Sequence, residues 1–301
     1  VGAYADQLEP VDDVIGRLVG KYGAINPVAE FLCRRNNAWR AIPATSGTQN
    51  KPALCRFDLL QRHAGIDVRA MWPARNEKGP GADTWNWDTF LMAAERCHAA
   101  GVPFGLPMGQ FTDAVDWVGG LFASYGARIT DERGNPTIRN NPQLRQVMEY
   151  AVRLARFLPN DVWAWDDASN NRALISGRSA LVFNPPSAWT VAKRDAPQVA
   201  ENCWTIPMPS GPQGRFLAYL PFNTGIWAFG RNKNAAKSFL EFLSERESAE
   251  FTTNFSGGYD IPPFASMSDF AVWTREGPPV GTIFNLSLIH ISEPTRPRLI
   301  S

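Results

Sequence analysis

The sequence predicts a two-lobed α/β protein, and two observations support this prediction. The chain has 301 residues, which is enough to bury two hydrophobic cores rather than one. Short apolar runs typical of buried strands alternate with longer segments in which apolar residues recur at helical spacing. Apolar residues make up 44% of the chain and charged residues 20%, values that are ordinary for globular proteins.

The composition argues against several classes of function. The net charge of +1 gives no electrostatic footprint for nucleic acid, and no apolar run is long enough to span a bilayer. The four cysteines lack the spacing of metal ligands, so we expect neither zinc nor another cofactor. They are interpreted as buried thiols. A Cys33–Cys55 disulfide is an alternative that would require an oxidising compartment.

The first part of the chain should alternate helices with strands. Asp12 and Asp13 stand in the first turn of an apolar-periodic segment, where the helix dipole favours acidic side chains. We expect helices at 11–21, 27–33 and 58–64, strands at 39–43 and 53–57, and a polar, hydroxyl-rich loop at 44–52. This loop suits either a ligand edge or a plain surface connection.

The middle of the chain contains a strand-to-helix junction rich in polar groups. Gln110, Asp113 and Asp116 lie beside Trp117, and such a set can grip hydroxyl groups, although helix capping alone would explain Asp113. We expect helices at 87–100, 114–124 and 143–157, a strand at 102–106 and a loop at 107–112. The first of these helices should be capped by Asp or Thr and end at Gly101.

A second junction of this kind lies in residues 176–193. A turn at Gly177 precedes the apolar strand 180–183, and Ser187 opens a helix with Trp189 in its first turn. Ligands bind at the carboxyl ends of strands in open α/β sheets. Trp189 is therefore a candidate for stacking on a sugar ring, and burial in the core is the alternative interpretation.

The last part of the chain is predicted to return to strands and helices and to end in a glycine-rich loop. Tyr259 lies at the tip of the loop 257–262. We expect strands within 203–212, 216–220 and 225–229, interrupted at 221–224, and helices at 234–243 and 247–255.

The order of several motifs resembles the extracellular solute-binding proteins of carbohydrate-type ABC importers. The resemblance covers about residues 8–264. Its motifs, in order, are WRAIP, CRFDLLQRHAGID, DTWNWDTFLMAAERCHAAG, SGRSALVF, NTGIWAF followed by NKNAAKSFLEFLSERES, and SGGYDIPP. Each motif is weak alone, and their common order makes the resemblance specific.

The resemblance implies a periplasmic-binding-protein-like fold of type II, with crossing segments between its lobes. These would be Ala41–Ala44, Leu220–Asn223 and Gly257–Pro262. Residues 1–43 and 222–256 would form the first lobe, and residues 44–221 and 257–285 the second. Compared with the family, the first lobe lacks its amino-terminal βαβ unit, and the helical part after about Phe284 is absent.

The resemblance also implies a set of ligand-binding residues. It places Thr45 and Ser46 just past the first crossing, and Ser187 and Trp189 at the strand-to-helix junction. The remaining positions that it implies are Gln110, Asp113, Gly225 and Tyr259. We expect hydrogen bonds from these polar groups to solute hydroxyls, each contributing about 1 kcal/mol.

The function that the resemblance implies is capture of a sugar or polyol between two lobes by hinge closure. The protein would be a periplasmic or extracellular monomer, exported by a signal not present in this sequence, and would deliver its solute to an ABC permease. It would not be an enzyme. The alternative is a glycoside hydrolase that uses Asp113 with Asp166 or Asp167. A glycan-binding sensor or adhesion module is a third interpretation that sequence cannot separate from the first.

The last residues do not resemble the rest of the chain. Residues 286–296 read LSLIHISEPTR, which looks like the translation of an adaptor used in DNA library preparation. We therefore expect residues 286–301 to be an artefact and exclude them from the fold prediction.

Overall fold

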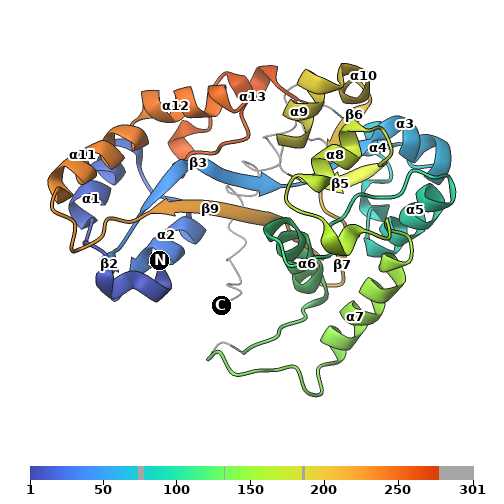
Figure 1. The fold of residues 1–301 in the computed structure, drawn as a ribbon, viewed down its shortest axis with the longest axis horizontal. Coiled ribbons are helices and arrows are strands. Elements are labelled where there is room, and N and C mark those ends of the chain that lie inside the picture. The colour runs from blue at the N-terminus through green and yellow to red at the C-terminus, as the bar shows by residue number, and fades with distance from the viewer. Residues whose placement is uncertain (74–77, 132, 185–186, 278–301) are drawn as a thin grey trace. The chain divides into compact units, whose positions relative to one another are not determined.

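Two units make up the chain, and each is described by itself (Figure 1). The computed structural model describes residues 1–73, 78–131, 133–184 and 187–277. Within these residues, unit 1 comprises Val1–Gln49 and Tyr219–Glu276, and unit 2 comprises Asn50–Ala218 and Gly277. The expected artefact at 286–301 lies outside the described residues.

Unit 1 packs helices around a pair of strands. Strand β3 (Ile42–Lys51) pairs with β9 (Ala218–Thr224), and β1 (Arg34–Arg35) pairs with β2 (Ala38–Trp39). The helices are η1 (Gly2–Gln7), α1 (Asp12–Tyr22), α2 (Pro27–Cys33), α11 (Lys233–Ser244), α12 (Arg246–Phe255), η5 (Ala265–Met267) and α13 (Val272–Arg275). Helix α1 buries Val14, Ile15 and Leu18.

Unit 2 is organised around a three-stranded antiparallel sheet in the order β5-β4-β6. The central strand β4 (Ala53–Arg56) pairs with β5 (Leu181–Phe183) and with β6 (Cys203–Ile206). A small hairpin joins β7 (Ser210–Gly211) to β8 (Gly214–Arg215). The sheet residues are almost fully buried, which fits their continuous apolar sequence.

Helices of very different lengths surround this sheet. Asn86 and Asn141 cap the two long helices α5 and α7 through side-chain oxygens that accept backbone N–H bonds. The helices are α3 (Phe57–Leu59), η2 (Leu60–Ala64), α4 (Val68–Met71), η3 (Ala82–Thr84), α5 (Trp87–Ala99), α6 (Thr112–Tyr125), α7 (Pro142–Ala155), η4 (Val162–Ala164), α8 (Ser169–Ile175), α9 (Ser187–Asp195) and α10 (Pro197–Ala200).

An aromatic cluster fills the core of unit 2. Phe90 stacks on Phe183 with ring centroids 5.3 Å apart, and Trp87 meets Phe90 edge-on at 5.2 Å. The Tyr150 hydroxyl donates to the Trp87 carbonyl at 2.7 Å. These rings are at most 1% exposed, so the four aromatic residues stabilise the unit by burial and by ring geometry.

All four cysteines are buried free thiols, as the sequence predicted. Cys33 belongs to unit 1 and Cys55 to unit 2, and the alternative disulfide between them is not formed. Burial raises the pKa of Cys33 to about 12 and that of Cys97 to about 11. These thiols are therefore protonated at neutral pH.

The sequence predicted most helices correctly but not the polar segment 44–52. This segment is most of strand β3, which pairs with β9 across residues 221–224, also expected to interrupt a strand. Gly47 permits this pairing, because its φ is +84° and a Cβ there would lie 2.8 Å from the Phe222 ring. The expected strand at 102–106 is not a regular strand, although Gly105 N–H donates to the Leu181 carbonyl of β5 at 2.8 Å.

The expected lobe boundaries also differ from the structure. Residues 257–276, assigned from sequence to the second lobe, belong to unit 1. Their backbone explains this, since Ile261 N–H donates to the Thr48 carbonyl at 2.8 Å and Asn26 N–H to the Pro263 carbonyl at 2.8 Å. Residues 44–49 belong to unit 1 as well, so the chain enters unit 2 at Asn50 rather than within Ala41–Ala44.

Candidate functional site

The junction between β5 and α9 presents two of the predicted residues. Ser187 is the first residue of α9, and Trp189 lies in its first turn. The indole is partly buried against an apolar cluster that includes Leu54 and Val182. The Lys193 ammonium lies 4.6 Å from its ring centroid. Trp189 is therefore neither fully enclosed nor fully exposed, and a solute stacking on the face near Lys193 would have to displace the ammonium.

Asparagine side chains extend this junction into a polar network. The Ser187 hydroxyl donates to Asn184 Oδ1 at 3.1 Å, and Asn184 Nδ2 donates to Asn171 Oδ1 at 2.6 Å. Asn171 N–H in turn donates to Asn170 Oδ1 at 2.8 Å. Asn184 is only 3% exposed and Asn170 is fully buried, so these amides hold one another in fixed orientations.

The same network reaches Asp113 and a buried lysine. Asn170 Nδ2 donates to Asp113 Oδ2 at 2.7 Å, and Lys51 Nζ lies 2.6 Å from Asp113 Oδ1. Lys51 Nζ also pairs with Asp116 Oδ2 at 2.5 Å. The Lys51 side chain is 4% exposed and that of Asp113 is 9% exposed. The structure thus joins Asp113 to Ser187 by hydrogen bonds within unit 2.

Two opposing effects act on the charge of Lys51. Burial disfavours the ammonium, but hydrogen bonds and charge from Asp113 and Asp116 outweigh it and raise the pKa of Lys51 above its ordinary value. A lysine with a raised pKa stabilises the fold fully below its ordinary pKa and loses that contribution only as the pH rises through the raised value. The Lys51 side chain is therefore charged at neutral pH.

Asp113 does not serve as a helix cap, which was the alternative to a ligand role. Helix α6 has Phe111 at its N-cap position without a side-chain cap, and Asp113 lies inside the first turn. Both carboxylate oxygens of Asp113 are already engaged by Lys51 and Asn170. Gln110 precedes the helix and is exposed.

Unit 1 contains the other four predicted residues. On β3, Thr45 is buried and Ser46 is exposed. Gly47 N–H donates to Asp260 Oδ1 at 2.9 Å, and this bond brings the loop that carries Tyr259 next to the strand that carries Ser46. The hydrogen bond between Gly47 and Asp260 therefore makes the segments that carry Ser46 and Tyr259 neighbours.

Burial raises the pKa values of both Asp260 and Tyr259. Burial raises the pKa of Asp260, and the hydrogen bond from Gly47 N–H opposes the shift only in part. The pKa of Tyr259 is raised, first by burial and then by the neighbouring Asp260 charge. The phenol is therefore a neutral hydrogen-bonding group at neutral pH.

Gly225 lies just after β9 and is explained by packing. A Cβ at this position would lie 2.9 Å from Leu8 Cδ2 and 3.3 Å from the Arg40 carbonyl oxygen. The absence of a side chain therefore allows the amino-terminal segment to approach.

Sequence reasoning missed Lys51 and the three asparagines of the network. Lys51 carried a signal, since it is the one charged residue in the polar stretch 44–52. The asparagines stand at element boundaries, where Asn184 directly follows β5 and Asn170 and Asn171 open α8. Within the described residues, no group of three or more His, Cys, Asp and Glu side chains could hold a metal ion.

A known protein family matches the larger part of the chain. Residues 57–250 match the family described as bacterial extracellular solute-binding protein. No curated protein is significantly similar in sequence. Among the helices of the described residues, none is long and apolar enough to cross a membrane.

Several solved structures share the fold. Maltose-bound MalE3 of T. maritima is 20% identical with a TM-score of 0.74, and the match covers 99% of this chain and 72% of that chain. A solute-binding protein of Agrobacterium radiobacter K84 in complex with ribitol is 16% identical with a TM-score of 0.72, covering 96% and 69%. A sugar transporter of Arthrobacter chlorophenolicus A6 with bound laminaribiose is 15% identical with a TM-score of 0.69, covering 96% and 68%. The predicted periplasmic-binding-protein-like α/β fold is confirmed.

Proposed function

The chain belongs to the bacterial extracellular solute-binding proteins, and we propose that its solute is an uncharged sugar or polyol, which it delivers to the permease of an ABC importer. The matching family is described as extracellular. This description confirms the predicted periplasmic or extracellular location. The three similar solved structures described above contain maltose, laminaribiose and ribitol. Their titles support a sugar or polyol as the solute class.

Family membership also decides between binding and hydrolysis. The matching family consists of solute-binding proteins, so the prediction of a non-enzyme is confirmed. The carboxylates agree with this conclusion. Hydrogen bonds from Ser169 and the Arg172 charge lower the pKa of Asp166, whereas a glycosidase general acid needs a raised pKa. Asp113 is occupied by Lys51 and Asn170.

The partly exposed indole of Trp189 beside the Ser187–Asn184–Asn171 network is the observation that supports the proposal best. An indole face binds the C–H face of a sugar ring, and oriented hydroxyl and amide groups bind its hydroxyls. Ser187 and Gln110 would contribute from unit 2. Unit 1 would contribute Ser46 and Tyr259, together with Thr45 and the Gly225 amide. Asp113 would hold Asn170 in place through their hydrogen bond. Its predicted contact with the solute would be a second role.

A thermal-shift series tests this proposal. We expect the melting temperature to rise with at least one of maltose, laminaribiose, ribitol and tagatose, because a ligand at 100 times its Kd stabilises the folded state by about 2.7 kcal/mol. Trp189→Ala should abolish the ligand-induced shift, and Trp189→Phe should restore part of it. Trp163→Ala is the matched control, because Trp163 is 59% exposed in the same unit.

Two results would contradict the proposal. If no compound in a broad sugar and polyol panel changes the melting temperature of the wild-type chain, the solute class is wrong. If Trp189→Ala keeps the full shift, the stacking role is wrong while the solute class stands. Hinge closure remains a prediction from the family resemblance. A radius of gyration that does not fall at saturating solute would contradict it.

A further inference from the structure

Residues 126–131 and 133–156 form a surface of unit 2 that is rich in arginine, which we call the arginine-rich face. It consists of the loop between α6 and α7 together with α7, and Figure 1 shows the loop extending away from both helices. Thr137 N–H donates to the Ile129 carbonyl at 2.9 Å and Asp131 N–H to the Asn135 carbonyl at 2.9 Å. These bonds hold the two arms of the loop together as a hairpin.

The charge of this face exceeds that of the whole chain. Residues 126–156 contain six arginines, no lysine and three acidic residues, a net charge of +3, whereas the entire chain carries +1. All six arginines are exposed. They are Arg128, Arg133, Arg139, Arg145, Arg153 and Arg156.

Large apolar side chains are exposed among these arginines. Ile129 and Ile138 lie on opposite arms of the hairpin and are 55% and 61% exposed. Met148 and Val152, one turn apart on α7, are 51% and 57% exposed. The opposite side of α7 buries Val147, Tyr150 and Leu154 in the core. The exposed side of α7 therefore carries apolar side chains that do not contribute to the core.

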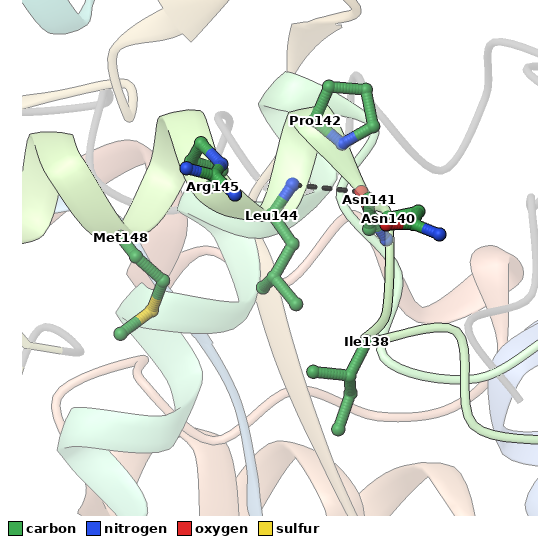
Figure 2. A pocket seen from close by; sticks show the side chains of 7 residues that line it. All are labelled: Ile138, Asn140, Asn141, Pro142, Leu144, Arg145 and Met148. Carbon is green, nitrogen blue, oxygen red and sulfur yellow. Dashed lines mark hydrogen bonds between the residues drawn. The ribbon is translucent and has the colours of Figure 1, made fainter.

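The apolar and basic groups meet around one hollow. Figure 2 shows Ile138, Leu144 and Met148 around it, with Arg145 and Asn140 also lining it. Its volume is about 460 Å³. A guanidinium next to exposed aliphatic groups suits a ligand that presents phosphate oxygens directly above hydrocarbon.

We propose that the arginine-rich face binds the surface of a bilayer that contains anionic phospholipids. Aliphatic side chains enter the boundary between headgroups and acyl chains, while arginines remain at the level of the phosphates. Met and Arg are also enriched at protein interfaces, so the choice of a lipid surface rests on the aliphatic side chains beside the arginines, which match phosphate headgroups above hydrocarbon. The inference rests on the proposed function only in that an importer component works beside a membrane.

Vesicle co-sedimentation tests this inference without any sugar. The wild-type chain should bind vesicles of 70% phosphatidylcholine and 30% phosphatidylglycerol at 50 mM NaCl, and bind poorly to pure phosphatidylcholine. Each arginine removed should weaken binding about fivefold, so Arg133→Ser/Arg139→Ser/Arg145→Ser should nearly abolish it. The control Arg62→Ser/Arg178→Ser/Arg194→Ser removes the same charge from exposed positions elsewhere in unit 2 and should bind like the wild type.

A second variant separates the lipid surface from an acidic protein partner. Ile129→Ser/Ile138→Ser keeps the charge and should still weaken vesicle binding severalfold, because aliphatic insertion adds to charge attraction. The inference is overturned if wild type does not bind the anionic vesicles, or if the control triple variant loses binding equally. It is also overturned in favour of an acidic protein if the isoleucine variant binds normally and soluble polyglutamate competes. None of these outcomes affects the thermal shift with sugars.

Discussion

Helix α5 of unit 2 and helices α11 and α12 of unit 1 bury their aromatic residues to very different degrees. In unit 2, α5 buries Trp87 and Phe90 to 1% exposure or less. In unit 1, α11 and α12 expose Phe239, Phe242, Phe251 and Phe255, the last at 86%. Both α5 and α11 have apolar residues at helical spacing. Amphipathic spacing therefore predicts a helix, whereas burial depends on the elements that the fold brings against that helix.

The largest expected difference between the units is in core truncation. Phe90→Ala should lower the free energy of unfolding of unit 2 by about 3–5 kcal/mol, because it leaves a cavity among buried rings. Phe251→Ala in unit 1 should stay within about 0.5 kcal/mol, as exposed substitutions do. Urea unfolding followed by circular dichroism measures both. Equal losses would show that the apolar side of α12 is covered in solution.

A slightly smaller effect is expected from breaking the buried ion pairs of unit 2. Lys51→Met should cost about 3 kcal/mol, because it leaves Asp113 and Asp116 without their counter-charge. Lys78→Met is the control, since its pair with Asp83 is solvent-exposed and should contribute little to stability. Thermal denaturation at pH 7 compares them. A loss below 1 kcal/mol for Lys51→Met would mean that solvent reaches the network.

Strand β3 provides a sharper test of unit 1. Gly47→Ala should cost about 1–3 kcal/mol, because alanine disfavours a φ of +84° and its Cβ would contact Phe222. Gly20→Ala, within α1 and with nothing near its Cβ, should instead stabilise by about 0.5–1 kcal/mol. Chemical denaturation distinguishes the two signs. A neutral Gly47→Ala would show that β3 and β9 separate easily.

The smallest expected effect concerns pH. The raised pKa of Asp260 means that its protonated form favours folding, so its contribution is present below the unfolded pKa and is lost as the pH rises through the folded value. Asp260→Asn keeps an acceptor for Gly47 N–H without the charge. It should therefore be more stable than wild type at pH 7 and show a flatter melting profile in the pH range just above the ordinary pKa of an aspartate. A variant that remains pH-sensitive in that range would place the titration elsewhere.

Local signals explain which parts of the fold could be predicted. Helices α1 and α2 carry acidic first-turn residues or a proline start, and the structure gives nearly the expected bounds. Strand β3 could not be predicted, because its polar residues become a strand only through pairing with β9, far away in sequence. Residues 257–276 were misplaced for a related reason, since their anchors Thr48 and Asn26 are also distant.

The candidate site also has one part that the sequence could predict and one part that it could not. The strand, turn and helix that place Ser187 and Trp189 are consecutive in sequence, so their junction could be predicted. The partners of Asp113 could not, because Lys51 and Asn170 come from segments more than 50 residues away on either side. The sequence immediately around either partner of a buried ion pair does not indicate the other partner.

The protonated, enclosed state of the four native thiols has a practical consequence for engineering. Burial raises the pKa of Cys203 to about 12, and that of Cys55 well above its ordinary value. Maleimide reagents attack thiolates that they can reach, so the native cysteines should remain unlabelled in the folded chain. A dye on one introduced surface cysteine would then report solute capture from a single position, with no native residue replaced beforehand.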